Sequence, residues 1–313
     1  MNRWMVFCFV ALLMVQKPLA AKRNDYPHEL SVCALFRDEA RFLREWVEYH
    51  RLVGVDHFFL YNNLSSDDWR EQLEPYLQRG IVEVIDWSQE SAGVEDWNAI
   101  QCGAYNDAIA RSARQTRWLA VIDTDEFIQP VKEKTLPAFL RHYEKFGGVG
   151  INWQMFGTSG VEELPPEALL LEQMVYKALE NDGVNTHVKT IVRPRRTRCF
   201  VNPHYALFLP GWYQVDTKKR RMEGPFTQDV CLDKAVINHY WPRDGRYARE
   251  YKLARRQKWG HGVTLEELTT LFNEVEDRKI GRFVPRLRHR LALLQKASCP
   301  ASSSSEAAVP LRS

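Results

Sequence analysis

The sequence predicts an α/β protein with a doubly wound, mostly parallel sheet flanked by helices. Short apolar runs suited to buried strands alternate with amphipathic segments of helical period over the first part of the chain. The 313 residues are 45% hydrophobic and 12% aromatic, which supplies enough apolar side chain for a large core. One apolar strand, at 118–122, ends abruptly in three carboxylates, which indicates a polar site at the edge of the sheet.

Strands and helices of the first part can be placed from their periodicity and end signals. We expect strands at 30–36, 55–61, 81–87 and 118–122. We expect helices at 39–53, 65–78 and 96–113, of which the first two stop at Gly54 and Gly80. Strands joined by helices in this way form a parallel sheet, and ligands of such sheets bind outside the carboxyl ends of the strands.

The second part of the chain predicts a mixed portion followed by helices. We expect a helix at 135–146 and strands at 148–156, 189–193, 199–208 and 235–241. Further helices are expected at 247–259, 264–275 and 282–297. These segments divide the chain into one domain at 28–260, C-terminal helices at 261–297 and a serine-rich, disordered tail at 298–313.

Residues 1–21 resemble a targeting segment. Arg3 precedes an apolar stretch of about 12 residues, which suits the core of a signal peptide and is shorter than the ~20 residues of a membrane-spanning helix. We therefore expect a signal peptide or short anchor, a location in the secretory pathway or at a membrane, and peripheral membrane association through the N-terminus. A cytoplasmic protein with an apolar leader is the alternative.

Charge and cysteine content narrow the classes of partner. The net charge is only +3, so nucleic acid is not an expected partner. Basic clusters at 193–198, 218–221 and 282–290 are either solvated surface or attract an anion such as a diphosphate or a membrane surface. The absence of a C-x-x-C pair argues against a zinc or redox site, and Cys199 and Cys231 could form a disulfide in a secreted chain.

The acidic cluster after 118–122 predicts a cation site. Asp123 and Asp125 are two residues apart, so their side chains point to the same side of an extended chain. Two converging carboxylates need a cation between them, or one of them must hold a proton. Arg37, the turn 61–63 and Asp86 also follow strands, so one rim of the sheet collects several polar side chains.

Three segments occur in an order that resembles a known family. They are VCALFRDEARFLREWVEYHRLVGVDHFFLYNN at 32–63, IDTDEF at 122–127 and VINHYW at 236–241. Together they resemble glycosyltransferase family 92 and its bacterial relatives over roughly residues 30–260. The resemblance implies a GT-A fold of the glycosyltransferase family 2-like clan, with an acceptor-side portion in the C-terminal half, and an inverting sugar transferase.

The same resemblance implies roles for individual residues. Asp123, Asp125 and His239 match a metal site for Mn²⁺ or Mg²⁺, with Asp125 as the direct ligand and Asp123 acting through water or the ribose. The positions that match the nucleotide side are Arg37, Tyr61, Asn62, Asn63 and Asp123. Segments 153–160 and 187–194, with His204 downstream, are expected near the acceptor.

The resulting functional prediction is a metal-dependent inverting glycosyltransferase. It would move a sugar from a nucleotide diphosphate sugar to a glycan or other hydroxyl acceptor, galactose being one sugar that the resemblance implies. The general base is expected among Glu223, Asp229 and Asp216, between which the sequence does not choose. The alternatives are a nucleotidyl or phosphoryl transferase that uses the same acidic site, and a non-catalytic carbohydrate-binding protein.

Overall fold

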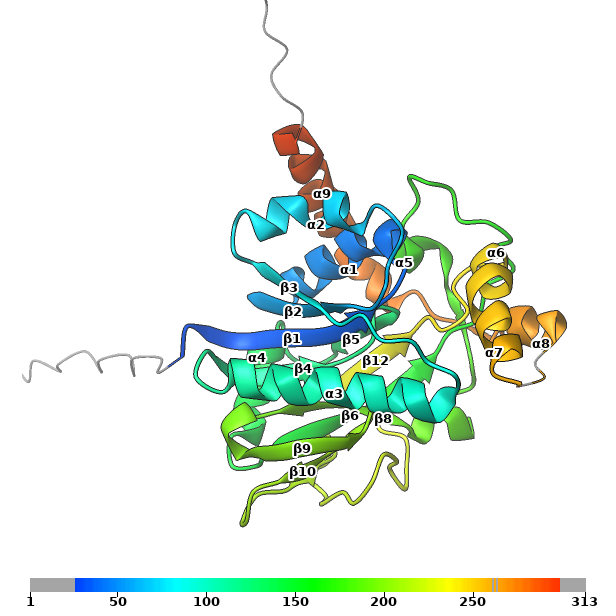
Figure 1. Cartoon of the computed structure of the whole chain (residues 1–313). Coiled ribbons are helices and arrows are strands. Elements are labelled where there is room, and N and C mark those ends of the chain that lie inside the picture. The colour runs from blue at the N-terminus through cyan, green and yellow to red at the C-terminus, as the bar shows by residue number, and fades with distance from the viewer. Residues whose placement is uncertain (1–25, 261, 263, 299–313) are drawn as a thin grey trace, which may run out of the picture.

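The computed structural model describes residues 26–260, 262 and 264–298, which form one mixed sheet of nine strands with helices on both faces, and two further sheets of two strands each (Figure 1). The strands are β1 (His28–Phe36), β2 (His57–Asn62), β3 (Val82–Asp86), β4 (Thr116–Val121), β5 (Glu126–Pro130), β6 (Gly148–Met155), β7 (Tyr176–Lys177), β8 (Val188–Val192), β9 (Thr197–Asn202), β10 (Tyr205–Phe208), β11 (Gln214–Val215), β12 (Ala235–His239) and β13 (Val275–Glu276). The α-helices are α1 (Ala40–Leu52), α2 (Trp69–Leu77), α3 (Val94–Ser112), α4 (Leu136–Leu140), α5 (Leu170–Gln173), α6 (Gly245–Tyr247), α7 (Ala254–Lys258), α8 (Leu265–Thr270) and α9 (Val284–Ser298).

The strand order confirms the predicted fold class. The sheet runs β3-β2-β1-β4-β8-β6-β12-β5, and β11 pairs with β6. Five of its eight pairings are parallel, including all those among the first four strands. The antiparallel pairings join β8 to β4 and β6, and β5 to β12. A parallel half therefore continues into a mixed half, as the sequence predicts.

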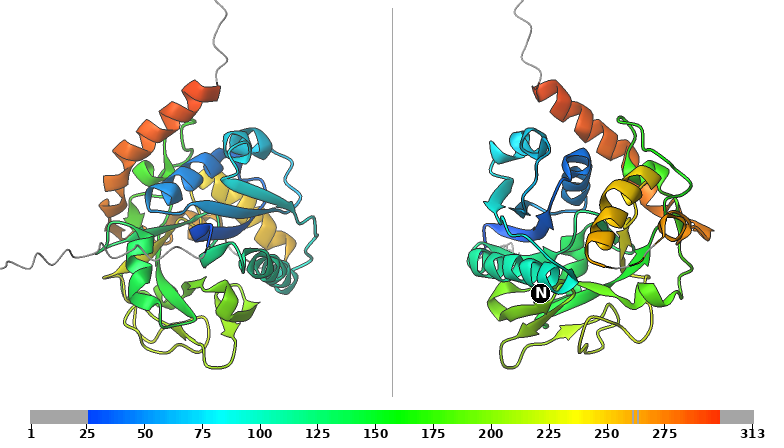
Figure 2. Two further views of the ribbon diagram at one scale, coloured as in Figure 1. Left: turned by 90° about the vertical axis from the view of Figure 1, so that its left-hand side faces the viewer. Right: turned by 45° about the vertical axis from the view of Figure 1, so that its right-hand side comes forward.

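Each face of the parallel half has its own core. Val32 and Ala34 of β1 pack into the cluster that includes α1, α2 and α9, whereas Cys33 and Leu35 pack against α3. This alternation is the period of two expected for a strand buried on both faces. Figure 1 and the turned views of Figure 2 show α1, α2 and α9 on one side of the sheet and α3 on the other.

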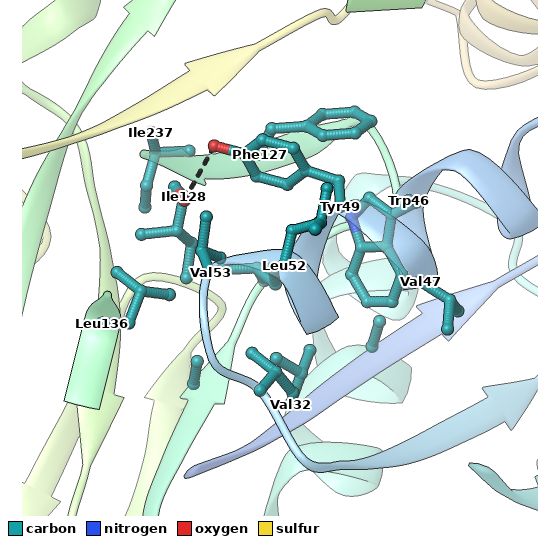
Figure 3. Packing of buried hydrophobic residues seen from close by; sticks show 14 of the residues in the cluster. Val32, Trp46, Val47, Tyr49, Leu52, Val53, Phe127, Ile128, Leu136 and Ile237 are labelled. Atoms are coloured by element: carbon teal, nitrogen blue, oxygen red, sulfur yellow. Dashed lines mark hydrogen bonds between the residues drawn. The ribbon is translucent and has the colours of Figure 1, made fainter. Parts of the chain in front are cut away.

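The strand that follows the acidic motif, β5, was not predicted from the sequence, and helix α1 fixes it in place. Tyr49 donates a hydrogen bond to the Ile128 carbonyl at 3.2 Å (Figure 3). The Trp46 indole donates to the Glu126 carbonyl at 2.8 Å. His50 accepts from the Ile128 amide at 3.3 Å through Nε2. The edge strand β5 thus gains buried partners from a helix as well as from β12.

Several elements of the second half differ from the sequence prediction. The helix expected at 247–259 is α6, a π-helical segment (Ala248–Leu253) and α7 in succession. The helix expected at 264–275 ends at Thr270, because Asn273 donates to the Thr269 carbonyl and β13 then pairs with β7. The strand expected at 199–208 is the hairpin β9–β10, and the helix expected at 135–146 is α4 followed by a 3₁₀ turn (Arg141–Tyr143).

The expectations for the termini and the cysteines have separate outcomes. The predicted leader at 1–21 lies outside the described residues, as does nearly all of the predicted tail. Among the helices that the structure describes, none is long and apolar enough to cross a bilayer. Cys199 and Cys231 are both free thiols, so the disulfide considered above is not present between them.

Candidate active site

A cleft of about 540 Å³ opens where β1, β4 and β12 end. Its wall combines aromatic surface with positive charge and the acidic motif. The tryptophans that line it are Trp97, Trp153, Trp241 and Trp259, and the cations are Arg37, Lys189, Lys252, Arg255 and Arg256. Arg255 lies over the rings of Trp97 and Trp259, at 5.3 and 5.4 Å from the ring centres. Such a wall suits a ligand that carries negative charge and a flat or hydroxylated ring.

Asp123 is held by side chains of the fold on both carboxylate oxygens. Oδ1 accepts from Gln101 at 3.0 Å and from Tyr105 at 3.2 Å, both on α3, and Oδ2 accepts from Lys189 of β8 at 2.9 Å. Burial opposes ionisation of Asp123, but the Lys189 ammonium outweighs it and lowers the pKa of this carboxyl. Asp123 is therefore an anchored carboxylate.

Asp125 has a different environment. Its Oδ2 accepts from Lys252 at 2.7 Å, and its Oδ1 lies 3.3 Å from Nε2 of His239 but accepts no hydrogen bond from the described residues. Burial opposes ionisation here too, but Lys252 and then His239 hold the pKa of Asp125 well below its usual range. A buried carboxylate oxygen with no donor is costly unless a ligand supplies one.

Glu126 is the third carboxylate of the motif and is fully buried. Its Oε2 accepts from the Asp123 amide at 2.9 Å, and its Oε1 is 3.9 Å from Nδ1 of His239. Burial raises the pKa of Glu126 well above its usual range, despite the Lys189 ammonium 3.9 Å away. Glu126 therefore shapes the turn between β4 and β5 and does not line the cleft.

These contacts allow a test of whether a divalent cation fits. Asp125 and His239 present an unpartnered carboxylate oxygen and an imidazole nitrogen toward each other, which are ligand types that suit Mn²⁺. Asp123 has no free oxygen in this arrangement, and within the described residues no three acidic, histidine or cysteine side chains form a cluster that could hold a metal. Asp125 and His239 could therefore hold a cation, and its other ligands would come from the substrate or from water.

A buried arginine joins the end of β1 to the C-terminal helical segment. Arg243 is fully buried, forms an ion pair with Glu39 and stacks over Phe42, 3.9 Å from the ring centre. Tyr247 donates to the same Glu39 at 2.8 Å. This network fixes the start of the segment that delivers Lys252, Arg255 and Arg256 to the cleft.

Three histidines surround Trp153 on the remaining wall. The ring centres of His187, His204 and His239 lie 4.8, 5.0 and 4.4 Å from that of Trp153. Nδ1 of His187 lies 2.9 Å from the Val184 carbonyl, which can only accept, so Nδ1 carries the proton and Nε2 is an acceptor. Burial lowers the pKa of His187, and burial lowers that of His204 further, to about 3. The segments expected near the acceptor therefore do meet at this wall.

The residues predicted for the nucleotide side divide into two groups. Arg37 lines the cleft and is partly exposed. Tyr61, Asn62 and Asn63 do not line it: Tyr61 is fully buried and donates to Asp107 at 2.7 Å, and Asn63 donates to the Trp87 and Gln89 carbonyls. Asn62 accepts from the Ser65 amide and shapes the turn after β2.

The three candidate bases lie away from the cleft. Asp216 is buried and paired with Arg220 at 2.6 Å, and Asp229 pairs with the same arginine at 2.7 Å. The Glu223 side chain is 80% exposed and faces Arg221. The carboxylates that do line the cleft are Glu39, Asp123 and Asp125, all of which have cationic partners.

Sequence reasoning missed the lysines that neutralise the two aspartates. Lys189 stands in the otherwise apolar strand VKTIV, and a lysine buried in such a strand needs an acidic partner. That signal could have paired it with the acidic motif. Lys252 lies in a helical segment with several other charged residues, so nothing in the sequence indicates that it is buried against an acidic partner.

The comparisons with known proteins agree with the segments quoted above. The sequence profile of glycosyltransferase family 92 matches residues 26–240. The chain belongs to glycosyltransferase family 92. A family 92 protein from Oryza sativa subsp. japonica is 30% identical over 217 residues, 68% of this chain and 33% of the relative. One from Arabidopsis thaliana is 25% identical over 233 residues, 70% of this chain and 36% of the relative. The chain therefore spans about a third of the length of these relatives.

Other similarities are weaker. A beta-1,4-galactosyltransferase from Caenorhabditis elegans is 27% identical over 120 residues, 36% of this chain and 28% of the relative. Among solved structures, the S. aureus protein TarS (residues 1–349) is 14% identical, with a TM-score of 0.35 over 53% of this chain and 47% of the other.

Proposed function

We propose that this family 92 protein transfers a sugar from a nucleotide diphosphate sugar to a hydroxyl group of a glycan, with inversion at the sugar carbon. The observation that carries the proposal is the cleft in which the acidic motif faces several cations and tryptophans. Galactose is the first donor sugar to test, since one relative is named a beta-1,4-galactosyltransferase. A β-linked product from an α-linked donor requires inversion.

The cleft cations have a defined task in this reaction. The acceptor oxygen forms a bond to the sugar carbon while the bond from that carbon to the diphosphate breaks, and the diphosphate leaves with both bonding electrons. Arg255 and Arg256 line the cleft where they can stabilise that developing charge, each stacked against a tryptophan. When bound to Asp125 and His239, Mn²⁺ or Mg²⁺ would neutralise further charge on the leaving diphosphate.

His187 is the base that we propose for the acceptor hydroxyl. It lines the cleft, its Nδ1–H is fixed by the Val184 carbonyl, and its Nε2 is left to accept a proton. His204 has the same tautomer, fixed by the Val188 carbonyl at 2.9 Å, but its pKa of about 3 makes it a poor base. We expect His187→Gln to lower kcat about a hundredfold, with a smaller loss in His204→Gln. Equal losses in both variants would argue against His187 as the base.

The activity can be tested directly with the whole chain. A panel of nucleotide sugars beginning with UDP-galactose is incubated with a glycan acceptor, with Mn²⁺, with Mg²⁺ or with EDTA, and nucleoside diphosphate release and product linkage are measured. We expect release that requires the acceptor and is lost in Asp125→Asn. Transfer of the nucleoside monophosphate with release of sugar 1-phosphate would favour a nucleotidyl transferase instead. Glycan binding without any turnover of the panel would favour a non-catalytic carbohydrate-binding protein.

A further inference from the structure

A second cavity lies behind the active-site cleft, on the other face of strands β6 and β12. Trp153 and His239 line the cleft, whereas their chain neighbours Gln154 and Asn238 line a separate cavity of about 800 Å³. Successive side chains of a strand point to opposite faces, which explains the separation. The two cavities share no lining residue. A ligand in the second cavity would therefore be separated from the reacting atoms by the sheet.

Buried amides form the floor of this cavity. Gln129, Gln154 and Asn238 are 4%, 1% and 4% exposed. The Asn238 amide donates to Oε1 of Gln129 at 2.9 Å. The NH₂ group of Gln129 and the carbonyl oxygen of Asn238 take no part in this bond, and both side chains line the cavity. The floor thus presents a hydrogen-bond donor beside an acceptor.

The charges of the wall are largely neutralised within the protein. Four carboxylates and three cations line the cavity. Lys177 pairs with Asp277 at 2.8 Å and contacts Gln154 at 3.2 Å, so the charge nearest the floor is already satisfied. Asp229 and Asp233 pair with Arg220 and Lys132, which lie outside the cavity lining. Arg282, the remaining cation, donates to the Pro130 carbonyl. A wall whose carboxylates are all paired favours a neutral, hydrogen-bonding ligand over a cation, and a single cation without a carboxylate partner among the described residues is little attraction for an anion among four carboxylates.

We propose that this cavity is a second, non-catalytic binding site for a neutral saccharide. A sugar hydroxyl both donates and accepts, which matches the donor and acceptor of Gln129 and Asn238. Valine and leucine side chains on the wall, among them Val131 and Val236, can cover the C–H face of a sugar ring. The cavity volume lies within the range typical of small-ligand sites. Binding here needs neither a donor nor a metal, so it can be measured whether or not sugar transfer is confirmed.

The experiment measures saccharide binding to the full chain by calorimetry and saturation-transfer NMR. The probes are lactose and cellotriose, with citrate as an anionic comparison, each measured without UDP and then with saturating UDP to occupy the cleft. Gln129→Leu removes the free donor and leaves the Asn238 amide unpartnered, so we expect about tenfold weaker saccharide binding. Gln78→Ala, which removes an exposed amide hydrogen-bonded to Glu74 at the end of α2, is the matched control and should bind as the unmodified chain does.

A second variant keeps the test decisive if Gln129→Leu does not fold. Asn181 and Gln228 are exposed amides on the rim of the same cavity, and the double variant Asn181→Ala/Gln228→Ala should weaken binding severalfold without disturbing the core. Weakening in either cavity variant and not in Gln78→Ala supports the site. The proposal is overturned if no saccharide binds saturably, if binding is unaffected by the cavity variants, if UDP displaces the saccharide, or if citrate alone binds.

Discussion

The two aspartates of the acidic motif are separated by one residue, but their hydrogen-bond partners come from different parts of the fold. On the Asp123 side, Gln101, Tyr105 and Lys189 occupy both carboxylate oxygens, and all three belong to elements of the central sheet or the helix that covers it. On the Asp125 side, Lys252 comes from the C-terminal helical segment, and one oxygen has no hydrogen bond from the described residues. Asp123 is thus held in place as a structural part of the cleft, which we call its frame, whereas Asp125 has an oxygen that a ligand can reach.

The largest expected effect is a loss of activity that is greater in the Asp125 variant than in the Asp123 variant. Asp125→Asn should lower kcat/KM by roughly 10²–10³-fold, because it removes the carboxylate that we propose as the cation ligand. Lys252 is also buried, so this variant should lower the thermal midpoint as well. Asp123→Asn should lower the thermal midpoint because it leaves Lys189 buried without a full charge partner, but it should lower kcat/KM less, since both oxygens of Asp123 are already occupied by side chains of the fold. Both variants are assayed for activity and for thermal unfolding. The comparison fails if the two profiles are the same.

The second effect concerns stability on the Asp123 side. Lys189 is 1% exposed and lies 2.9 Å from Asp123, so Lys189→Met should lower the free energy of unfolding by about 3 kcal/mol. Lys132→Met is the control, because the Lys132–Asp233 pair is more than half exposed and such pairs contribute at most about 1 kcal/mol. Denaturant unfolding measures both. Similar small losses would mean that Lys189 is not part of the frame.

The third effect is a loss of stability in acid that arises on the Asp123 side. Burial, followed by the Lys189 charge, lowers the pKa of His204 from 6.5 to about 3. Because the folded pKa is the lower one, the neutral ring stabilises the fold above pH 6.5, and this is lost as the pH falls from 6.5 towards 3. Between pH 7.5 and 5.5 the unmodified chain should lose about 1.4 kcal/mol more than His204→Gln. Parallel unfolding curves for the two proteins would contradict this.

The smallest effect tests the lysine on the Asp125 side. Lys252 lies 2.7 Å from Oδ2 of Asp125 and competes with any cation for that carboxylate. Lys252→Met should therefore tighten Mn²⁺ binding about threefold to tenfold, as measured by the electron paramagnetic resonance of free Mn²⁺. Lys258→Met, on the exposed side of the same segment, should leave binding unchanged. Weaker binding in Lys252→Met would show that the lysine orients Asp125 instead of competing for it.

The parallel half of the fold could be predicted because its signals are local. The first four strands and three helices have clear periodicity and glycine stops, and the structure places them within a few residues of the expected ranges. Strand β5 could not be predicted in this way, because its five residues form a strand only where α1 and β12 supply hydrogen bonds. The C-terminal helical segment was predicted as helix, but its π-helical turn was not.

The candidate site could be predicted in part. The motif 123–125, Arg37 and His239 do meet in one cleft, because chain order and strand ends place them on one rim. The base was assigned to carboxylates in 216–229, since sequence distance gave no reason to exclude them. The structure places those carboxylates away from the cleft, and the tautomer of His187, the base that we propose, depends on a backbone carbonyl three residues away.

The sequence by itself determined the family, the parallel half of the sheet and the position of the acidic motif at a strand end, because each depends on residues close together in the chain. Only the tertiary structure decided which aspartate is occupied and which has a free oxygen. That difference depends on Lys189 and Lys252, which lie 66 and 127 residues away from their partners in the chain. Whether a carboxylate can bind a ligand depends on the charged side chains that packing brings within hydrogen-bonding distance. The spacing of residues within a motif does not predict which side chains those are.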